Sequence, residues 1–213
     1  MGDRFYRVVR ALGRPVFWVT SSPVVTGTEH VPATGPCIVA ANHTSPYDIP
    51  LLMRHVPRLI DFVSITEVFR HPLVAWFYGS LNAFPLERSR PDAPAVRILL
   101  DRLARGRVVG IFPEGGFRRG AASVVASRKV QPGIGRIAGL AGAPVIPAVI
   151  VNSSAYSKAR AWLPFRGTRY GVQFGPAIPP GRPAEEIESS LVEAMVKLCH
   201  SLSSRLPPSC RTV

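Results

Sequence analysis

A buried strand, a turn and the start of a helix are predicted by residues 36–48, which read Pro36-Cys37-Ile38-Val39-Ala40-Ala41-Asn42-His43-Thr44-Ser45-Pro46-Tyr47-Asp48. The uninterrupted apolar run Cys37–Ala41 is typical of a strand that is covered on both faces. Ser45 suits the N-cap of the following helix, Pro46 its first position and Asp48 its third. His43 is therefore expected in the turn between the strand and the helix.

Strand-like and helix-like segments alternate along the rest of the chain. The predicted strands are Cys37–Ala41, Leu59–Ile65, Ala83–Leu86, Val108–Phe112 and Val145–Val151, with Tyr170–Phe174 as an edge strand. The predicted helices are Ile49–His55, Pro72–Tyr78, Ala93–Arg105 and Ala184–Ser204. This alternation predicts a single α/β domain, residues 27–213, with a mostly parallel or mixed sheet covered by helices. Ligands of such sheets bind in the loops at the carboxyl ends of the strands.

Residues 1–26 are expected to form an N-terminal amphipathic segment at a membrane interface. The basic face of the predicted helix contains Arg4, Arg7, Arg10 and Arg14, and the opposite apolar face contains Phe5, Val8, Val9 and Leu12. A basic face opposite an apolar face is the pattern of a helix that lies in a membrane surface. The alternative is an ordinary surface helix packed on the domain. We therefore expect a peripheral protein on the cytoplasmic face of a membrane, in contact with its phospholipids.

The chain carries a strong positive charge, because 26 lysine and arginine residues outnumber 13 aspartate and glutamate residues, for a net charge of +13. Such a field favours anionic partners, which include phospholipid headgroups, phosphorylated substrates, acidic carrier proteins and nucleic acid. A nucleic-acid module would need basic and aromatic residues on one sheet face. The aromatic residues here cluster in the N-terminal helix and in apolar segments, so no nucleic-acid partner is expected.

The three cysteines predict neither a metal site nor a disulfide framework, because Cys37, Cys199 and Cys210 lack metal-ligand spacing and are odd in number. Cys37 is expected in the core, and the N-terminus lacks the apolar region of a secretory signal. Residues 137–157 contain no charged side chain and are about long enough to span a bilayer. Pro144 and Pro147 interrupt this run, so we expect a short helix, a turn and a buried strand instead.

His43 and Asp48 are the first candidate site residues. Five residues apart on one helix, two side chains point away from each other, but across a turn they can converge. A carboxylate beside an imidazole fixes the tautomer of the ring and stabilises the imidazolium that forms on proton uptake. The pair therefore predicts a general base. The alternative is that Asp48 only caps the helix and His43 is an ordinary loop residue.

Further candidates lie near the ends of other predicted strands. The segment Gly79–Arg88 ends in an arginine whose planar fork can clamp a phosphate, with a solvated arginine as the alternative. The loop Phe112–Gly120 combines Glu114 with two glycines, which let backbone N–H groups approach an anion, and with two arginines. A plain turn is the alternative there. Pro144–Pro147 begins an apolar strand, where core packing and the lining of an apolar ligand can coexist.

Together and in this order, the segments resemble the glycerolipid acyltransferase family that includes the bacterial lysophosphatidate (1-acylglycerol-3-phosphate) acyltransferases. The resemblance extends from about Gly27 to Phe174, and four ordered motifs are far more specific than any one of them. The family's motifs are matched by His43 and Asp48 (His-x4-Asp), by Gly79 to Arg88 with a longer spacing, by Phe112 to Gly115 (Phe-Pro-Glu-Gly) and by Val145 to Pro147 (Val-Ile-Pro).

The resemblance implies a role for each matching residue. His43 would deprotonate the acceptor hydroxyl, and Asp48 would orient the histidine. The arginine of the second motif and the glutamate of the third would bind the glycerol phosphate of the acceptor, and the proline of the fourth would lie by the acyl chain. The implied substrate-binding residues are Arg88, Glu114, Gly115, Arg118 and Pro147.

The chain departs from the family pattern at two positions that concern anion binding. Relatives often continue Phe-Pro-Glu-Gly with Thr-Arg-Ser, whereas Gly116 and Phe117 here precede Arg118. Thr66 and Glu67 stand where relatives often carry a Lys-Glu pair. Because of these changes the sequence does not determine which headgroup the acceptor carries, but the class of reaction is unaffected.

The resemblance implies transfer of a fatty acyl group from acyl-CoA or acyl-carrier protein to the free hydroxyl of a lysophospholipid. The leading acceptor is 1-acylglycerol-3-phosphate, which gives phosphatidate. A thioester is already activated, so no covalent enzyme nucleophile is required, and the chain has no Gly-x-Ser-x-Gly elbow. No metal or cofactor is expected. The alternatives are another lysolipid acceptor, a hydrolase that releases the acyl group to water, and a non-enzymatic basic binding module.

Overall fold

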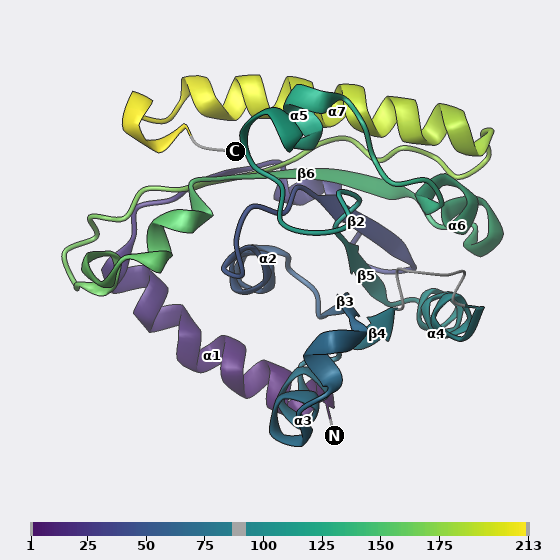
Figure 1. The fold of residues 1–213 in the computed structure, drawn as a ribbon, viewed down its shortest axis with the longest axis horizontal. Helices are drawn as coiled ribbons and strands as arrows, with labels where there is room; N and C mark the ends of the chain where they lie inside the picture. The colour runs from purple at the N-terminus through teal and green to yellow at the C-terminus, as the bar shows by residue number, and fades with distance from the viewer. Residues whose placement is uncertain (1, 87–92, 212–213) are drawn as a thin grey trace.

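The sheet runs through the centre of the molecule in the computed structural model, which describes residues 2–86 and 93–211 (Figure 1). Its seven strands lie in the order β1-β7-β6-β2-β5-β3-β4. Neighbouring strands are parallel except for β6 and β7, which are antiparallel. The predicted mixed sheet is therefore confirmed. The strands are β1 (Val24–Thr26), β2 (Cys37–Ala41), β3 (Ile60–Ile65), β4 (Phe84–Leu86), β5 (Val108–Ile111), β6 (Val145–Val151) and β7 (Gly171–Phe174).

Helices cover both faces of the sheet (Figure 1). One face carries α1 (Gly2–Thr20) and α2 (Asp48–His55), with α3 (Pro72–Ser80) beside the start of α1. The other carries α4 (Ala93–Ala104), α5 (Val124–Ser127), α6 (Ile134–Ala141) and α7 (Ala184–Ser204). Short 3₁₀ turns complete the described chain: η1 (Thr28–His30), η2 (Thr66–Phe69), η3 (Gly120–Ala122), η4 (Ser153–Ser157), η5 (Ala159–Trp162) and η6 (Pro208–Cys210).

Strand β2 explains why the core has two layers. Its side chains alternate between the faces, so that Cys37, Val39 and Ala41 join the cluster under α1 and α2. Ile38 and Ala40 join the cluster under α4, α6 and α7. All five are fully buried, which is why the strand is a continuous apolar run. Burial raises the pKa of the Cys37 thiol to about 11, as suits a core cysteine.

The edge-strand prediction for Tyr170–Phe174 is wrong. Strand β7 lies inside the sheet, because β6 pairs with it on one side and β1 on the other. The true edge is β1, whose Val24–Thr26 pair in parallel with Gly171–Gln173. A strand of three half-buried residues has too little pattern to stand out in a sequence. The last residues of the predicted N-terminal segment, 1–26, thus contribute to the sheet.

The predicted N-cap of the helix after β2 is also wrong. Helix α2 begins at Asp48, with Tyr47 in the N-cap position. The Oγ atom of Ser45 accepts a hydrogen bond from the Tyr47 N–H at 3.2 Å, and the backbone carbonyl of Ser45 accepts one from the Asp48 N–H at 3.1 Å. Ser45 therefore closes a separate tight turn before the helix.

The uncharged stretch 137–157 folds as predicted into the end of α6, a turn and the buried strand β6. All seven β6 residues are buried, and the strand pairs with β2 and β7. Among the helices of residues 2–86 and 93–211, none has both the length and the hydropathy that a membrane crossing requires.

Helix α1 has a more complex surface than the two predicted faces. Tyr6, which belongs to neither predicted face, is fully buried and sets the orientation of the helix. Phe5 and Val9 pack against the core beside it. Val8 and Leu12 are exposed instead, to 54% and 69%. The prediction of one continuous apolar face was wrong in part, because tertiary packing divides these four side chains between core and solvent.

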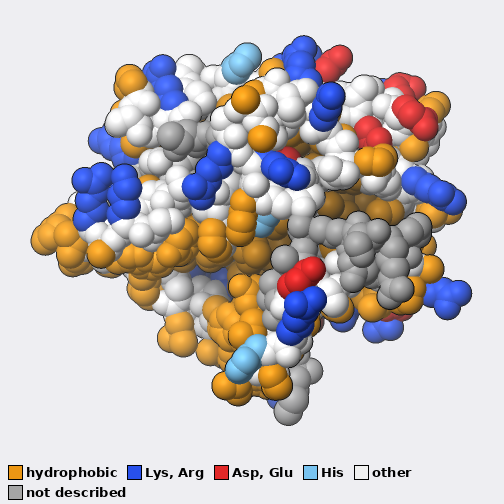
Figure 2. All heavy atoms as spheres, in the orientation of Figure 1, with side chains coloured by type: hydrophobic (Ala, Val, Ile, Leu, Met, Phe, Trp, Pro, Cys, Tyr) orange, Lys and Arg blue, Asp and Glu red, His pale blue; other side chains and the backbone are white. Residues whose placement is uncertain are grey.

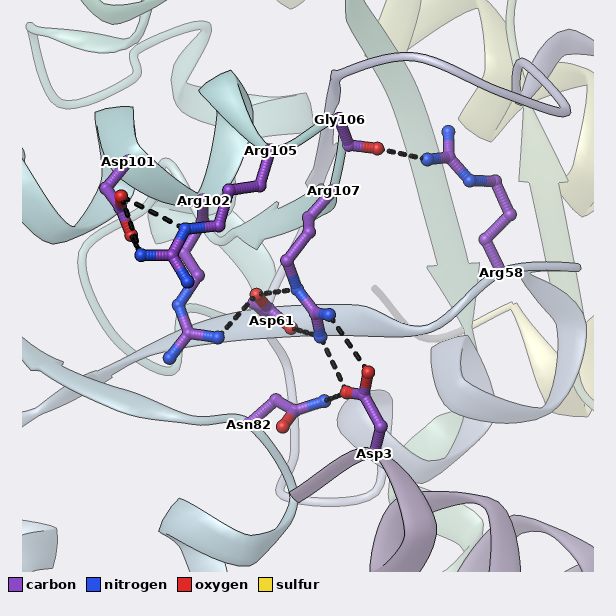
Figure 3. Close-up of polar contacts among 9 residues, drawn as sticks. All are labelled: Asp3, Arg58, Asp61, Asn82, Asp101, Arg102, Arg105, Gly106 and Arg107. Atoms are coloured by element: carbon purple, nitrogen blue, oxygen red, sulfur yellow. Dashed lines mark hydrogen bonds and ion pairs between the residues drawn. The ribbon is translucent and has the colours of Figure 1, made fainter. Parts of the chain in front are cut away.

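An ionic network around the buried Asp61 carboxylate attaches the start of α1 to the sheet (Figure 3). Arg107 donates to Asp61 through Nε at 2.5 Å and Nη2 at 2.6 Å, and through Nη2 to Asp3 Oδ1 at 2.9 Å. Asp61 is fully buried in β3. Arg102 approaches it to 3.4 Å, and the Asn82 amide donates to Asp3 at 2.8 Å. The arginine hydrogen bond holds the pKa of Asp3 at about 2.

We expect Arg107→Gln to lower the free energy of unfolding by about 3 kcal/mol, because it removes the two short hydrogen bonds of the buried Asp61 carboxylate and leaves it only the longer ion pair with Arg102 at 3.4 Å. Urea denaturation would measure the change. The matched control is Arg105→Gln, whose partner Asp101 is half exposed; it should cost less than about 1 kcal/mol. Equal losses in the two variants would contradict a structural role for the network around Asp61.

Candidate active site

The imidazole of His43 and the carboxylate of Asp48 meet across the turn after β2. His43 Nδ1 lies 3.0 Å from Asp48 Oδ2. Asp48 is fully buried, and 10% of the His43 side-chain surface is exposed. The convergence predicted from the sequence is therefore present. The catalytic role of the pair stays a prediction.

One oxygen of Asp48 organises the whole turn. Besides the imidazole, Oδ2 accepts hydrogen bonds from the backbone N–H groups of Thr44 at 2.7 Å and Ser45 at 2.9 Å. Within the described residues, Oδ1 has no hydrogen-bond partner. An acceptor carboxylate at Nδ1 favours the tautomer with a proton there, which leaves the lone pair on Nε2. The same negative charge would stabilise a His43 imidazolium.

Strand register explains why the Glu114 loop meets the histidine turn. Strands β2 and β5 are parallel, with Ala40 opposite Ile111, and the same offset sets His43 opposite Glu114. Glu114 Oε2 accepts the His43 backbone N–H at 2.6 Å, and Oε1 accepts the Val124 N–H at 2.6 Å. Glu114 is therefore a buried link between two loops. Its predicted role in binding the acceptor stays a prediction.

Two aromatic rings hold the imidazole. Phe112 stacks on His43 with ring centroids 3.8 Å apart and planes at 12°, while Phe117 lies at 4.3 Å and 47°. Phe62 stacks behind Phe112 and joins the site to the core. Phe117 is 55% exposed, so it covers the imidazole from the solvent side. Phe117 is one of the residues that depart from the family pattern.

Several residues of the site lacked a role in the sequence analysis. Asn42 is fully buried and spans to β6, where its amide donates to the Ile150 carbonyl at 2.9 Å and accepts the Ile150 N–H at 2.7 Å. Ser153 Oγ lies 3.0 Å from Thr44 Oγ1 and 2.9 Å from Ser45 Oγ. These bonds hold the turn from the β6 side. The signal available in the sequence was the polar residues that follow the two strands, with Asn42 directly after β2 and Ser153 two residues after β6.

The two arginines after the glycine pair act differently. Arg118 is exposed, and its backbone N–H donates to the His43 carbonyl at 2.8 Å. Its predicted contact with substrate stays a prediction. Arg119, which was not among the predicted site residues, donates from Nε to the Thr44 carbonyl at 2.7 Å. Both arginines thus attach their loop to the histidine turn.

The remaining predicted residues are placed as follows. Gly115 has a φ of 70°, and a Cβ there would lie 3.1 Å from Gln131, so the loop requires glycine. Pro147 lies between Ile146 and Ala148, which face the layer of α1 and α2, so its ring faces the opposite layer. The structure does not bring Pro147 to His43, and its place by an acyl chain stays a prediction. Arg88 lies outside the described residues.

The comparisons with known proteins agree with this fold and identify the family. The sequence model of the family described as Acyltransferase matches residues 22–151, more than half of the chain. The chain belongs to this family, as its four motifs predicted.

Among individual relatives, a crystal structure of the 1-acyl-sn-glycerophosphate (LPA) acyltransferase PlsC from Thermotoga maritima aligns over 95% of this chain and 81% of its own, with a TM-score of 0.69 and 25% identity. The 1-acyl-sn-glycerol-3-phosphate acyltransferase of Bacillus subtilis is 28% identical over 61% of this chain and 63% of its own length. The lyso-ornithine lipid O-acyltransferase of Pseudomonas aeruginosa is 37% identical over 38% of this chain and 31% of its own. The chain spans less than two thirds of the curated relatives it matches.

We expect Glu114 to make stability fall with rising pH. Burial raises the pKa of its carboxyl from 4.5 to about 6, against the two backbone N–H groups that lower it. Between these values the folded protein binds more protons than the unfolded chain, so raising the pH lowers the free energy of unfolding, by about 2 kcal/mol in total. The contribution is complete below pH 4.5 and is lost as the pH rises through 6.

Urea denaturation between pH ~4 and ~7 would measure this slope. Glu114→Gln should remove it, and should also lower stability at every pH because an NH2 group, which cannot accept, replaces one of the two oxygens that each accept a backbone N–H. The control is Glu188→Gln, which removes another carboxylate bonded to backbone N–H groups and leaves Glu114 in place. An unchanged slope in Glu114→Gln would show that another group is responsible.

Proposed function

We propose that the protein transfers a fatty acyl group from acyl-CoA or acyl-carrier protein to the free hydroxyl of a lysophospholipid. The proposed acceptor is 1-acylglycerol-3-phosphate, and the product is phosphatidate. The observation that carries this proposal is the buried His43–Asp48 pair at 3.0 Å, placed at the carboxyl end of a central strand. The relatives from Bacillus and Thermotoga, named for acyl transfer to this class of acceptor, support the choice.

In the proposed mechanism His43 acts as a general base. Asp48 holds the Nδ1 proton, and Nε2 takes the proton of the acceptor hydroxyl as its oxygen attacks the thioester carbonyl carbon. A carbon–oxygen bond forms, and the carbonyl electrons move onto the oxygen. The imidazolium that results is stabilised by the Asp48 carboxylate at 3.0 Å.

Collapse of the tetrahedral intermediate completes the reaction. The oxyanion reforms the carbonyl, the carbon–sulfur bond breaks, and the departing thiolate takes the proton from His43. The products are an ester and a free thiol, and the histidine returns to its neutral form. Phe112 and Phe117 limit the access of water to the imidazole, which favours the acceptor hydroxyl over hydrolysis of the thioester.

We expect His43→Ala to lower acyl transfer by at least ~10²-fold, because a positioned base typically contributes ~10²–10⁴. Purified protein with labelled acyl-CoA or acyl-carrier protein and 1-acylglycerol-3-phosphate would measure it. The control is His200→Ala, an exposed histidine on α7 that should retain full activity. Near-normal transfer by a folded His43→Ala variant would refute the base assignment.

The same assay with several acceptors addresses the headgroup. The panel includes a lyso-ornithine lipid, because the Pseudomonas relative named for that substrate is 37% identical over its matched stretch. Preferred turnover of 1-acylglycerol-3-phosphate supports the proposal. Preferred turnover of the lyso-ornithine lipid would support the proposed acyl transfer but would show that 1-acylglycerol-3-phosphate is not the preferred acceptor.

We also propose peripheral binding to the cytoplasmic face of a membrane through an apolar belt. This belt follows α1 from α3 at one end to η5 at the other, where the rings of Phe5 and Trp76 lie 5.4 Å apart and those of Phe17 and Trp162 lie 6.1 Å apart. Figure 2 shows hydrophobic side chains gathered across this side of the molecule. An exposed apolar surface of this extent is typical of a membrane or protein contact. The belt comprises Val8, Leu12, Val16, Leu73, Trp76, Phe77, Trp162, Leu163 and Phe165.

We expect Leu12→Ser/Leu73→Ser to weaken binding to phospholipid vesicles at least ~10-fold, because both side chains are about 70% exposed and lose their transfer to the bilayer. Co-sedimentation with vesicles would measure this. The control is Ile98→Ser/Leu140→Ser, which alters exposed apolar residues on α4 and α6, on the opposite face of the sheet. Equal effects would show that the belt is not the membrane contact. Deleting α1 is a poorer test, because Tyr6 and Phe17 belong to the core.

A further inference from the structure

A basic cleft lies between α1 and the amino-terminal ends of β3 and β5, with a volume of about 610 Å³. Five arginines and one aspartate supply its charged lining: Asp3, Arg7, Arg10, Arg14, Arg58 and Arg107. The cleft is separate from the proposed active site. Arg107 precedes β5 whereas Glu114 follows it. The cleft therefore lies at the amino-terminal ends of the strands and the proposed active site at their carboxyl ends.

Two of the arginines form a fixed wall. Arg107 is held by the Asp61 carboxylate and by Asp3, as Figure 3 shows. Arg58 donates to three backbone carbonyls, those of Pro32 at 3.1 Å, Gly35 at 2.7 Å and Gly106 at 2.5 Å. The guanidinium groups of this wall are positioned before any ligand binds.

The other three arginines lack an anionic partner. Arg7, Arg10 and Arg14 lie on one flank of α1, and none of them forms a salt bridge with a carboxylate of residues 2–86 or 93–211. The nearby Asp3 carboxylate is already bonded to Arg107 and Asn82. Like charges one turn apart on a helix repel each other. A bound anion would remove this repulsion.

We propose that this cleft binds a water-soluble, phosphate-bearing ligand, a diphosphate or a phosphate ester, between the three α1 arginines and the Arg58–Arg107 wall. The guanidinium forks of Arg7, Arg10 and Arg14 would bind phosphate oxygens in bidentate fashion. Both forks of Arg107 are taken by Asp61 and Asp3, so this residue shapes the cleft and is not a main phosphate donor. The volume of the cleft lies within the range of small-ligand sites. Because the cleft lies at the strand ends opposite to those that carry His43, its ligand is not the acyl acceptor in its reacting position.

The geometry of α1 favours a soluble ligand over a lipid headgroup. Arg10 and Arg14 are each two residues from Leu12, which places their side chains about 200° from it around the helix. Leu12 belongs to the apolar belt, 69% exposed. When the belt rests on a bilayer, as proposed above, the cleft faces the water on the other flank. This step alone rests on the proposed membrane binding.

Titration calorimetry on the full chain, with inorganic pyrophosphate as the probe, tests the proposal. Arg7→Gln/Arg10→Gln/Arg14→Gln should weaken binding at least ~10-fold, since charge-assisted bonds to three guanidinium groups are lost. The control is Arg97→Gln/Arg136→Gln/Arg205→Gln, which removes the same charge from exposed positions on α4, on α6 and after α7. This variant should bind within about twofold of the wild type.

A second variant keeps the proposal testable if the triple arginine variant does not fold. Ala11→Glu adds one carboxylate to the lining of the cleft at an exposed helical position, and it should also abolish pyrophosphate binding. A parallel arm uses vesicles of anionic phosphatidylglycerol. Absence of pyrophosphate binding by the wild type, or equal losses in the control, would overturn the proposal. The proposal would also be overturned if the triple arginine variant lost vesicle binding but kept its pyrophosphate binding. That result would assign the three α1 arginines to lipid headgroups.

Discussion

The carboxylate of Asp48 is the interaction on which the arrangement of this protein's site depends. A single buried oxygen accepts hydrogen bonds from the His43 ring and from two consecutive backbone N–H groups. This closes the turn between β2 and α2 and orients the imidazole in one step. A carboxylate can be fully buried only when it is bonded in this way, because the loss of its hydration is otherwise too costly.

The sheet supplies the second constraint. Because β2 lies between β5 and β6 and is parallel to both, the loops that follow these three strands meet at their carboxyl ends. Glu114 binds the histidine turn from the β5 side, and Asn42 and Ser153 connect it to β6. The site is therefore held by contacts from three strands that are far apart in the sequence. Glu114 and Asn42 bond to backbone groups, and Ser153 bonds to the side-chain hydroxyls of Thr44 and Ser45, so the turn is held through both main chain and side chains.

Helix α1 separates surfaces of different chemistry. Its buried side carries Tyr6 and Phe17, one exposed flank carries Leu12 and the other carries Arg10 and Arg14. The buried Tyr6 and the Asp3–Arg107–Asp61 network together fix the rotation of the helix and therefore the direction of each flank. The proposed membrane contact and the proposed ligand cleft thus lie on opposite flanks of this one helix.

The sequence by itself determined the α/β class, the central apolar strands and the turn that joins His43 to Asp48. These features depend on local periodicity and on neighbours within a few residues. It also showed that residues 137–157 do not form a membrane helix, because two prolines interrupt them. The family followed from four short motifs in a fixed order.

Only the tertiary structure decided the pairing of β1 with β7, the side of the sheet to which Pro147 points, and the division of the α1 apolar residues between core and solvent. It also gave Glu114 its two backbone partners and Arg119 its bond to the Thr44 carbonyl. All of these are contacts between distant parts of the chain. Such contacts form only when several elements pack together, so a pattern read along one segment does not contain them.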